Sequence, residues 1–269
     1  MGTRATKRAN RTGGAGSVPA SDNGRAVFLT GASSGIGRAL AVELARRGYR
    51  LAISARREER LITLKEEIAS FAPDLQVVAR RLDVTDTGAV FEAFAAAAAE
   101  LGGIDIAIAN AGVASRSEAG SGEFKHAKRT IEVNVIGAMA TVDAAVRHFR
   151  ERGRGHVVGI CSVAGMRGLP RSAPYSASKA ALAIYLEAVR AELLGSGIDV
   201  SVIHPGFIAT EINEDLPRRP FVIGAARGAR IIANQIERRV RVTTAPVIPW
   251  GVLSRVLKLL PVRLLARLR

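Results

Sequence analysis

The feature that most constrains the fold of this chain is a glycine-rich turn joining a strand-like run to a helix-like run. Apolar residues 26–29 precede the turn, residues 39–48 form a helix-like run that ends at a glycine, and the turn itself reads Thr30-Gly31-Ala32-Ser33-Ser34-Gly35-Ile36-Gly37. A strand–turn–helix unit directs backbone N–H groups and a helix N-terminus at one point, where a pyrophosphate can bind. The spacing is G-x-x-x-G-x-G, not the common G-x-G-x-x-G, and alone it also fits a plain tight connection. With its flanks it predicts a phosphate-binding turn.

Strand-like and helix-like segments alternate along the rest of the chain. Short apolar runs suited to strands buried in a parallel sheet lie at residues 51–54, 76–80, 104–109, 156–161 and 198–204. Helix-like stretches lie at residues 58–70, 87–101, 125–150 and 175–194. A length of 269 residues suits one α/β domain with a sizeable core. The order predicts a single Rossmann-type domain: a doubly wound parallel β-sheet with helices on both faces.

A second feature is the pair Tyr175 and Lys179, four residues apart in a helix-like stretch. Residues i and i+4 share one face of a helix, so an ammonium can lie beside a phenol. A phenol has a reference pKa of about 10, and lowering it by roughly three units takes about 4 kcal/mol. A cation in a dry site can supply that preference and make the phenol a proton carrier near neutral pH. Such pairs also arise by chance, so the pair gains weight only from the turn upstream.

Seven motifs follow one another along about residues 25–212: Thr30–Gly37, Asp83-Val84, Asn110-Ala111-Gly112, Asn134, Ser162, Tyr175-x-x-x-Lys179, and Pro205-Gly206 with Thr210. Together and in this order, they resemble those of the short-chain dehydrogenase/reductase family. One position departs from the family pattern: the family usually has an asparagine directly before Asn110, and here Ala109 stands there.

The resemblance implies a nicotinamide cofactor and assigns residues to each part of it. The phosphate turn would contact it through Gly31, Ser33, Ser34, Gly35, Ile36 and Gly37. Asp83 and Val84 match the pair beside adenine, and Asn110, Ala111 and Gly112 match the turn beside the cofactor. Pro205, Gly206, Ile208 and Thr210 match the contacts around the nicotinamide, where Tyr175 and Lys179 also lie.

The residues after the second strand-like run favour NADP(H) over NAD(H). An NAD site places an acid at the end of that strand to bind the ribose 2′-hydroxyl. Here no acid stands there, and Arg56 occupies the next position, with Arg57 and Arg38 as candidate helpers. A guanidinium binds a phosphate through two parallel N–H···O bonds. The alternative is that Arg56 is a solvated residue at a helix start.

The resemblance also implies a catalytic set of four residues. Tyr175 would exchange a proton with the substrate oxygen, and Lys179 would lower the pKa of Tyr175 and hold the nicotinamide ribose. Ser162 would hydrogen-bond the substrate oxygen and stabilise its developing charge. Asn134 would hold a water that links Lys179 to solvent. Each has a plainer role open to it: Ser162 as a cap at a strand end, and Asn134 as a residue at a helix kink.

The net charge of +15 belongs to the two ends of the chain. Residues 1–25 hold five basic residues and one acid, and residues 218–269 hold twelve and one, which leaves residues 26–217 neutral. Residues 1–24 lack an apolar run and are expected to form a disordered basic tail, with an organelle transit segment as the alternative. Residues 25–249 form the expected catalytic domain.

The last segment, residues 250–269, is basic and amphipathic. Leucines and valines recur at steps of three and four, five basic residues fall between them, and Pro261 should divide the helix. Five cations in this length exclude an ordinary spanning helix. The segment therefore either lies on an anionic membrane surface or packs on its own domain or on a partner. Nucleic acid is not expected, because aromatic residues for stacking are scarce.

Two classes of function remain open at this stage. The first is an NADP(H)-dependent oxidoreductase acting on a carbonyl or alcohol, with a lipophilic substrate if the protein lies on a membrane. The second is a cofactor-binding sensor or scaffold that uses its basic ends. The resemblance also implies a homo-oligomer, and the expected location is the cytoplasm, with peripheral membrane contact in view. Cys161 is interpreted as a small buried residue, and the spacing of Cys, His and acids predicts no metal site.

Overall fold

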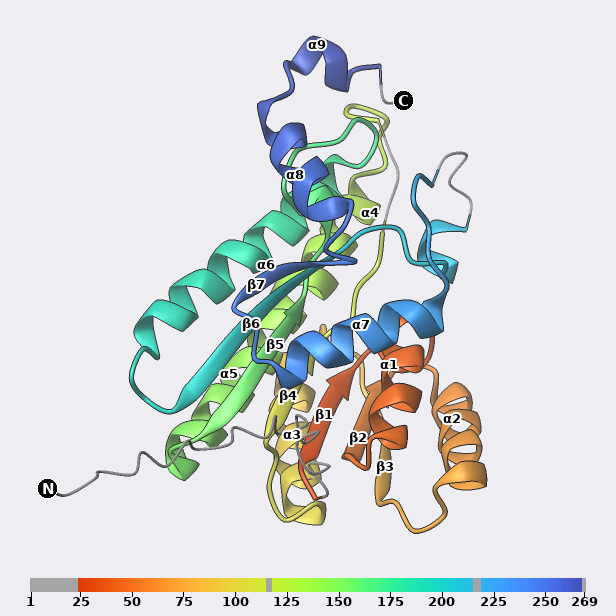
Figure 1. The fold of residues 1–269 in the computed structure, drawn as a ribbon, viewed down its shortest axis with the longest axis vertical. Helices are drawn as coiled ribbons and strands as arrows, with labels where there is room; N and C mark the ends of the chain where they lie inside the picture. The colour runs from red at the N-terminus through yellow and green to blue at the C-terminus, as the bar shows by residue number, and fades with distance from the viewer. Residues whose placement is uncertain (1–23, 115–117, 215–218, 268–269) are drawn as a thin grey trace, which may run out of the picture.

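A computed structural model describes residues 24–114, 118–214 and 219–267, which form a parallel sheet of seven strands (Figure 1). The strands lie in the order β3-β2-β1-β4-β5-β6-β7, and every neighbouring pair is parallel. The order reverses between β1 and β4, the switch point at which ligands bind in such sheets. The strands are β1 Ala26–Thr30, β2 Arg50–Ala55, β3 Val77–Arg81, β4 Ile106–Ala109, β5 Gly155–Ile160, β6 Ile198–Pro205 and β7 Val242–Ala245.

Helices cover both faces of the sheet, as Figure 1 shows, so the predicted doubly wound architecture is confirmed. One face carries α1 Gly35–Arg46, α2 Glu58–Phe71 and α7 Ala225–Glu237. The other carries α3 Thr87–Glu100, α4 Phe124–Ile131, α5 Gly137–Arg152 and α6 Ala173–Glu192.

Successive side chains along each strand point to opposite faces of the sheet, so the core is divided into two clusters. In β1, the fully buried Phe28 belongs to the cluster under α3, α5 and α6, whereas its neighbours Val27 and Leu29 belong to the cluster under α1, α2 and α7. Successive side chains of a strand point to opposite faces, so a strand buried on both faces must be apolar throughout. This explains why the strands read as short continuous apolar runs.

The structure differs from the sequence prediction in two places. The single helix expected over 125–150 is interrupted by a π-helical turn, Glu132–Ile136, between α4 and α5. Neither β7 nor α7 was predicted. β7 is a four-residue edge strand with two threonines, and Val242 at its start is 52% exposed, so it has no apolar run for a periodicity argument to find.

The C-terminal segment forms two short helices, α8 Trp250–Leu259 and α9 Val262–Leu265, which are separated at Pro261 as that proline predicts. One side of α8 packs on the domain: the buried Trp250 ring lies 5.7 Å from the ring of Phe207 and 6.2 Å from that of Phe221. Both helices project beyond the carboxyl ends of the strands (Figure 1).

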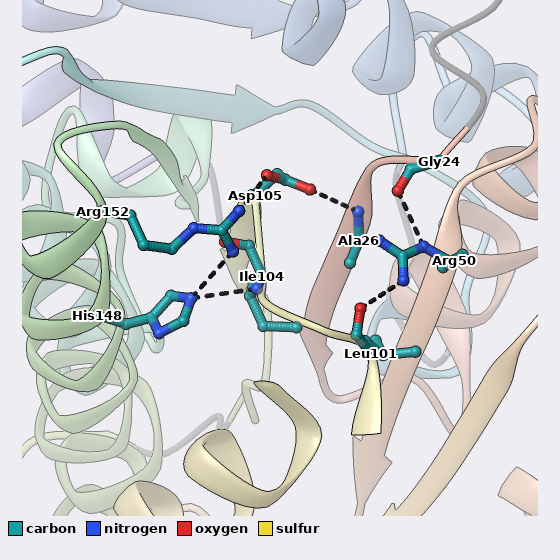
Figure 2. Close-up of polar contacts among 8 residues, drawn as sticks. All are labelled: Gly24, Ala26, Arg50, Leu101, Ile104, Asp105, His148 and Arg152. Atoms are coloured by element: carbon teal, nitrogen blue, oxygen red, sulfur yellow. Dashed lines mark hydrogen bonds and ion pairs between the residues drawn. The ribbon is translucent and has the colours of Figure 1, made fainter. Parts of the chain in front are cut away.

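Polar contacts fasten the opposite, amino-terminal end of the sheet (Figure 2). The carboxylate of Asp105, just before β4, accepts a hydrogen bond from the Ala26 N–H at 2.9 Å and lies 3.3 Å from Nη2 of Arg152. Arg50 donates to the Gly24 carbonyl oxygen at 2.9 Å. These contacts satisfy backbone groups at the amino-terminal end of the sheet and hold the starts of β1, β2 and β4 together.

Within the described part of the chain, no helix combines the length and the apolar character that crossing a bilayer requires. The predicted N-terminal tail lies outside the described residues, apart from Gly24.

Candidate active site

The glycine-rich turn connects β1 to α1 at the carboxyl end of the sheet. Gly31 and Gly35 have positive φ angles of 72° and 57°, which side chains rarely allow. A Cβ atom at Gly37 would lie 2.2 Å from the Gly31 carbonyl oxygen, so only glycine lets the helix start this close to the turn. Ser34 at the N-cap makes no side-chain capping bond. The first N–H groups of α1 therefore lack the usual side-chain acceptor.

The end of β4 is fastened to this turn. The hydroxyl oxygen of Thr30 accepts hydrogen bonds of 3.1 Å from the N–H groups of Asn110 and Ala111. The Asn110 side-chain amide donates to the carbonyl oxygens of Thr30, at 2.9 Å, and Gly31, at 3.3 Å. The predicted residues 31–37 and 110–112 are thus brought together at the switch point of the sheet.

The guanidinium that reaches the turn belongs to Arg57. Its Nη2 donates to Ser34 Oγ at 2.7 Å and to Ser33 Oγ at 3.2 Å. Arg56, the residue named first from the sequence, is exposed at the end of β2. Arg38 forms an ion pair of 2.5 Å with Glu67 on α2.

These observations fit a bound dinucleotide. The uncapped helix start offers backbone N–H donors for a pyrophosphate, and Gly37 leaves no side chain in the way. Arg57 beside two serine hydroxyls offers charged and neutral donors for a further phosphate.

Asp83 and Val84, expected beside adenine, follow β3. One Asp83 carboxylate oxygen accepts from the N–H and the hydroxyl of Thr85, at 3.0 and 2.8 Å, and the other lies 2.9 Å from Arg129. Burial raises the pKa of Asp83, but the hydrogen bonds from Thr85 and Arg129 outweigh it and hold that pKa below its usual value. Val84 is buried, and a Cβ at Gly137 would lie 2.6 Å from its side chain.

Tyr175 and Lys179 lie in the first turns of α6, over the carboxyl end of β5. The Lys179 ammonium is buried and donates to the Ile160 carbonyl oxygen at 2.9 Å. Burial lowers the pKa of Lys179. Burial raises the pKa of Tyr175 and outweighs its hydrogen bond with Ser162, which lowers it. The direction predicted for Tyr175, a pKa lowered by Lys179, is therefore not found here, because desolvation dominates and the ammonium is bonded to a backbone carbonyl.

Ser162 links the phenol to the end of β5. Its hydroxyl caps a short 3-10 turn by accepting from the Ala164 N–H at 3.1 Å, and it is hydrogen-bonded to Tyr175. Its carbonyl oxygen lies 3.1 Å from Nδ1 of His204 on β6. The plainer role of Ser162 as a cap and its place beside Tyr175 are thus both present.

Asn134 is fully buried in the π-helical turn. Its amide bonds the Val113 backbone, and its Nδ2 donates to Ser178 Oγ at 3.0 Å. A Cβ atom at Gly112 would lie 3.3 Å from both Asn134 Oδ1 and Lys179 Nζ, so these three residues converge.

The segment after β6 crosses the same end of the sheet. The Gly206 N–H donates to the Ala245 carbonyl oxygen at 3.0 Å, and Ile208 is buried. A Cβ at Gly35 would lie 3.4 Å from Thr210, so Thr210 stands against the glycine-rich turn. The carboxylate of Glu211, the next residue, lies 2.7 Å from Arg60 and 3.4 Å from Arg57.

Sequence reasoning missed three residues that shape this site. Arg129, which fixes Asp83, and Glu211, which reaches Arg57 and Arg60, lie far along the chain from their partners, so no local spacing signals them. Trp250 was noted only as the start of the C-terminal segment. A Cβ at Gly206 would lie 2.0 Å from its Nε1, so the indole covers the turn after β6.

Comparison with known proteins agrees with this geometry. A sequence model of the family described as short chain dehydrogenase matches residues 25–220. An uncharacterized oxidoreductase of Mycobacterium tuberculosis is 38% identical over 242 residues, which cover 90% of this chain and 96% of the relative. One from Myxococcus xanthus is 39% identical over 241 residues, covering 88% and 93%. The crystal structure of levodione reductase matches with a TM-score of 0.76 at 26% identity, covering 82% of this chain and 96% of that one.

Proposed function

The chain belongs to the short-chain dehydrogenase/reductase family, an oxidoreductase family, and we propose that it is an NADP(H)-dependent enzyme that interconverts a carbonyl and an alcohol. The observation that carries the proposal is the convergence of Ser162, Tyr175 and Lys179 at the carboxyl end of β5. Ser162 and Lys179 are 9% and 4% exposed, and such buried polar groups would be costly without a task, because they lose hydration in the interior.

The proposed cofactor would lie across the switch point of the sheet. The turn residues 31–37 would hold its pyrophosphate, Asp83 and Val84 its adenine, and Arg57 with Arg56 its 2′-phosphate. Residues 110–112 and 205–210 would surround the nicotinamide. The bound nicotinamide supplies the hydride chemistry, and the protein supplies alignment and charge.

The proposed proton transfer runs through Tyr175. In reduction its hydroxyl donates a proton to the substrate oxygen, and in oxidation it takes that proton back. A raised pKa keeps the phenol protonated at neutral pH, as a proton donor must be. Ser162 hydrogen-bonds the same substrate oxygen and stabilises its charge. Lys179 favours the phenolate once the proton has left.

Asn134 would position a water that returns protons toward Lys179. Its side-chain amide already makes three hydrogen bonds, to Val113 N–H, Val113 carbonyl and Ser178. We therefore place the water on main-chain groups of the π-helical turn, where the i→i−4 bonding pattern is interrupted.

The test is NADPH consumption against a panel of carbonyl compounds, with Tyr175→Phe as the variant. We expect Tyr175→Phe to lower turnover by about 10²–10⁴-fold, the usual contribution of a positioned acid, while NADPH binding stays near normal. Tyr49→Phe, which removes a phenol hydroxyl that lies 3.5 Å from Glu237 and away from Ser162, is the control. Turnover by Tyr175→Phe at the parent rate would exclude this assignment.

We further propose that the protein contacts an anionic membrane surface and acts on a lipophilic substrate. The outward side of α8 carries Val252, Val256 and Leu259, which are 61%, 48% and 84% exposed, beside the exposed cations Arg255 and Lys258. An exposed apolar face with basic neighbours suits the boundary between lipid headgroups and acyl chains. In Figure 1 this helix stands beyond the carboxyl ends of the strands, the end at which the proposed site lies.

Co-sedimentation with phosphatidylserine-containing vesicles tests this contact. Serine at positions 252, 256 and 259 together should abolish binding and leave the buried Trp250 side of α8 intact. Serine at Ile62 on α2 and at Leu194 in the turn after α6, which are 51% and 82% exposed, is the matched control. Equal sedimentation of the two variants would refute the membrane contact.

A homo-oligomer through α5 and α6 completes the proposal. A groove of about 560 Å³ runs between these helices, with Asp143, Arg147 and Tyr185 among its lining residues. Ile184 on α6 is 67% exposed. Light scattering on the parent and on Ile184→Arg tests it, because a buried arginine at an interface should shift the mass toward the monomer.

A further inference from the structure

We propose that Glu211 competes with the 2′-phosphate of the cofactor for the same guanidinium groups, and so sets how strongly the protein prefers NADP(H) over NAD(H). The inference rests on the proposed NADP(H) dependence. It assigns a specificity-determining role to an acid that lies 151 residues beyond Arg60 in the chain.

The first step is the position of the carboxylate. Glu211 begins the short 3-10 turn Glu211–Asn213 that follows β6. One carboxylate oxygen lies 2.7 Å from Nη1 of Arg60, and the other lies 3.4 Å from Nη1 of Arg57. Arg57 is the N-cap of α2 and Arg60 lies in its first turn, so one acid bridges the start of α2 to the segment after β6.

The second step is that Arg57 is shared between Glu211 and the glycine-rich turn. Its Nη1 faces Glu211, while its Nη2 donates to Ser33 Oγ and Ser34 Oγ in the glycine-rich turn. A phosphate at the end of β2 would seek the same donors: the guanidinium edge and the two hydroxyls. The Glu211 carboxylate thus lies on a donor group that a 2′-phosphate needs, and carries charge of the same sign.

The third step is that hydrogen bonds within the segment hold the turn that carries Glu211. Asn213 Nδ2 donates to the Ile208 carbonyl oxygen at 2.8 Å, and Asn213 Oδ1 accepts from the Thr210 N–H at 3.4 Å. A Cβ at Gly35 would lie 3.4 Å from Thr210. The turn that carries Glu211 therefore stands beside the glycine-rich turn. In Figure 1 the chain after β6 crosses to the side of the molecule where α1 and α2 lie.

The charge state of Glu211 agrees with competition for the guanidinium groups of Arg57 and Arg60. Hydrogen bonding to Arg60 is the largest cause that lowers the pKa of Glu211, and Arg57 adds to it, so the carboxylate is ionised at neutral pH. The Glu211 side chain is 55% exposed, and exposed ion pairs contribute little to folding. Its removal should therefore change cofactor affinity without unfolding the protein.

The test measures dissociation constants by calorimetry for NADPH, NADH and adenosine 2′,5′-bisphosphate. We expect Glu211→Gln to bind both 2′-phosphate ligands about fivefold tighter, because the guanidinium groups of Arg57 and Arg60 no longer pair with an exposed carboxylate. The affinity for NADH should stay unchanged. Glu214→Gln, in the same segment, is the matched control for loss of one negative charge. In the double variant Glu211→Gln with Arg57→Gln, the gain should disappear.

The outcomes separate the two proposals. Unchanged or weaker binding of the 2′-phosphate ligands by Glu211→Gln overturns the competition, because the acid would then be neutral toward the arginines or needed to orient them. A parent protein that binds NADH as tightly as NADPH overturns the proposed NADP(H) dependence itself. Equal gains in Glu211→Gln and Glu214→Gln would reduce the effect to net charge and also overturn the role of Glu211.

Discussion

The side-chain amide of Asn134 holds the backbone of Val113 by two hydrogen bonds: Nδ2 donates to the Val113 carbonyl oxygen at 2.9 Å, and Oδ1 accepts from the Val113 N–H at 2.8 Å. The same Nδ2 also donates to Ser178, the neighbour of Lys179. One buried amide therefore joins the π-helical turn, the chain after β4 and α6. The predicted catalytic asparagine is at once a structural clamp.

This relationship predicts a stability cost for Asn134→Ala. The substitution removes both hydrogen bonds from Asn134 to the part-buried Val113 backbone, and a buried group left unsatisfied costs about 1–3 kcal/mol. We expect the free energy of unfolding in urea to fall by about that amount. Turnover should fall with it, since Gly112 and Lys179 lose their common neighbour. Asn234→Ala, on the exposed side of α7, is the control and should change neither value.

The geometry of the candidate site could be predicted from the sequence where it depends on local spacing. The turn 30–37 requires glycine because its backbone conformation and close contacts exclude a side chain of any size. Tyr175 and Lys179 share a helix face by periodicity alone. Their placement at the carboxyl ends of parallel strands follows from the fold.

The same reasoning failed where contacts come from distant parts of the chain or depend on desolvation. The bond from Lys179 to the Ile160 carbonyl oxygen and the raised pKa of Tyr175 depend on burial, which spacing does not report. Spacing alone also does not show which of two adjacent arginines turns toward Ser33 and Ser34. Arg56 was named first from the sequence, and Arg57 makes the contact.

Cofactor binding should respond to the arginines after β2. Arg57→Gln removes a charged donor from the proposed phosphate position, a change worth roughly tenfold in affinity. We expect the dissociation constant of NADPH to rise by about that factor and that of NADH to stay nearly constant; Arg56→Gln should act in the same direction. Arg46→Gln, whose guanidinium lies over the Phe71 ring, is the control. Equal losses for NADPH and NADH would mean that Arg57 supports the turn without reading the phosphate.

The thiol of Cys161 should be unreactive in the folded protein. It is 3% exposed at the end of β5, and burial, partly offset by the nearby Lys179 charge, raises its pKa to about 12. The thiolate is the reactive form, so almost none is present at pH 8. We expect an aromatic disulfide reagent to leave the native protein unlabelled and to label one thiol per chain in guanidinium. Rapid labelling of the native protein would contradict the burial of this residue.

Stability should also depend on pH through His156. This residue is 1% exposed in β5, and its Nε2 lies 2.8 Å from Ser201 Oγ on β6. Burial, with a smaller effect from Arg239, lowers its pKa from 6.5 to about 4. The folded protein thus holds a neutral imidazole over a pH range in which the unfolded chain is protonated.

The sign of the effect follows from this difference. Above pH 6.5 neither state binds the proton, and the stability contribution is complete; as the pH falls from 6.5 toward 4, the unfolded chain takes up a proton that the folded protein refuses, and stability is lost. Between pH 7.5 and 5 the loss should be about 2 kcal/mol. Urea unfolding at both values should show a smaller loss in His156→Gln, by about that amount. Identical pH dependence in the parent and His156→Gln would show that the imidazole titrates alike in both states.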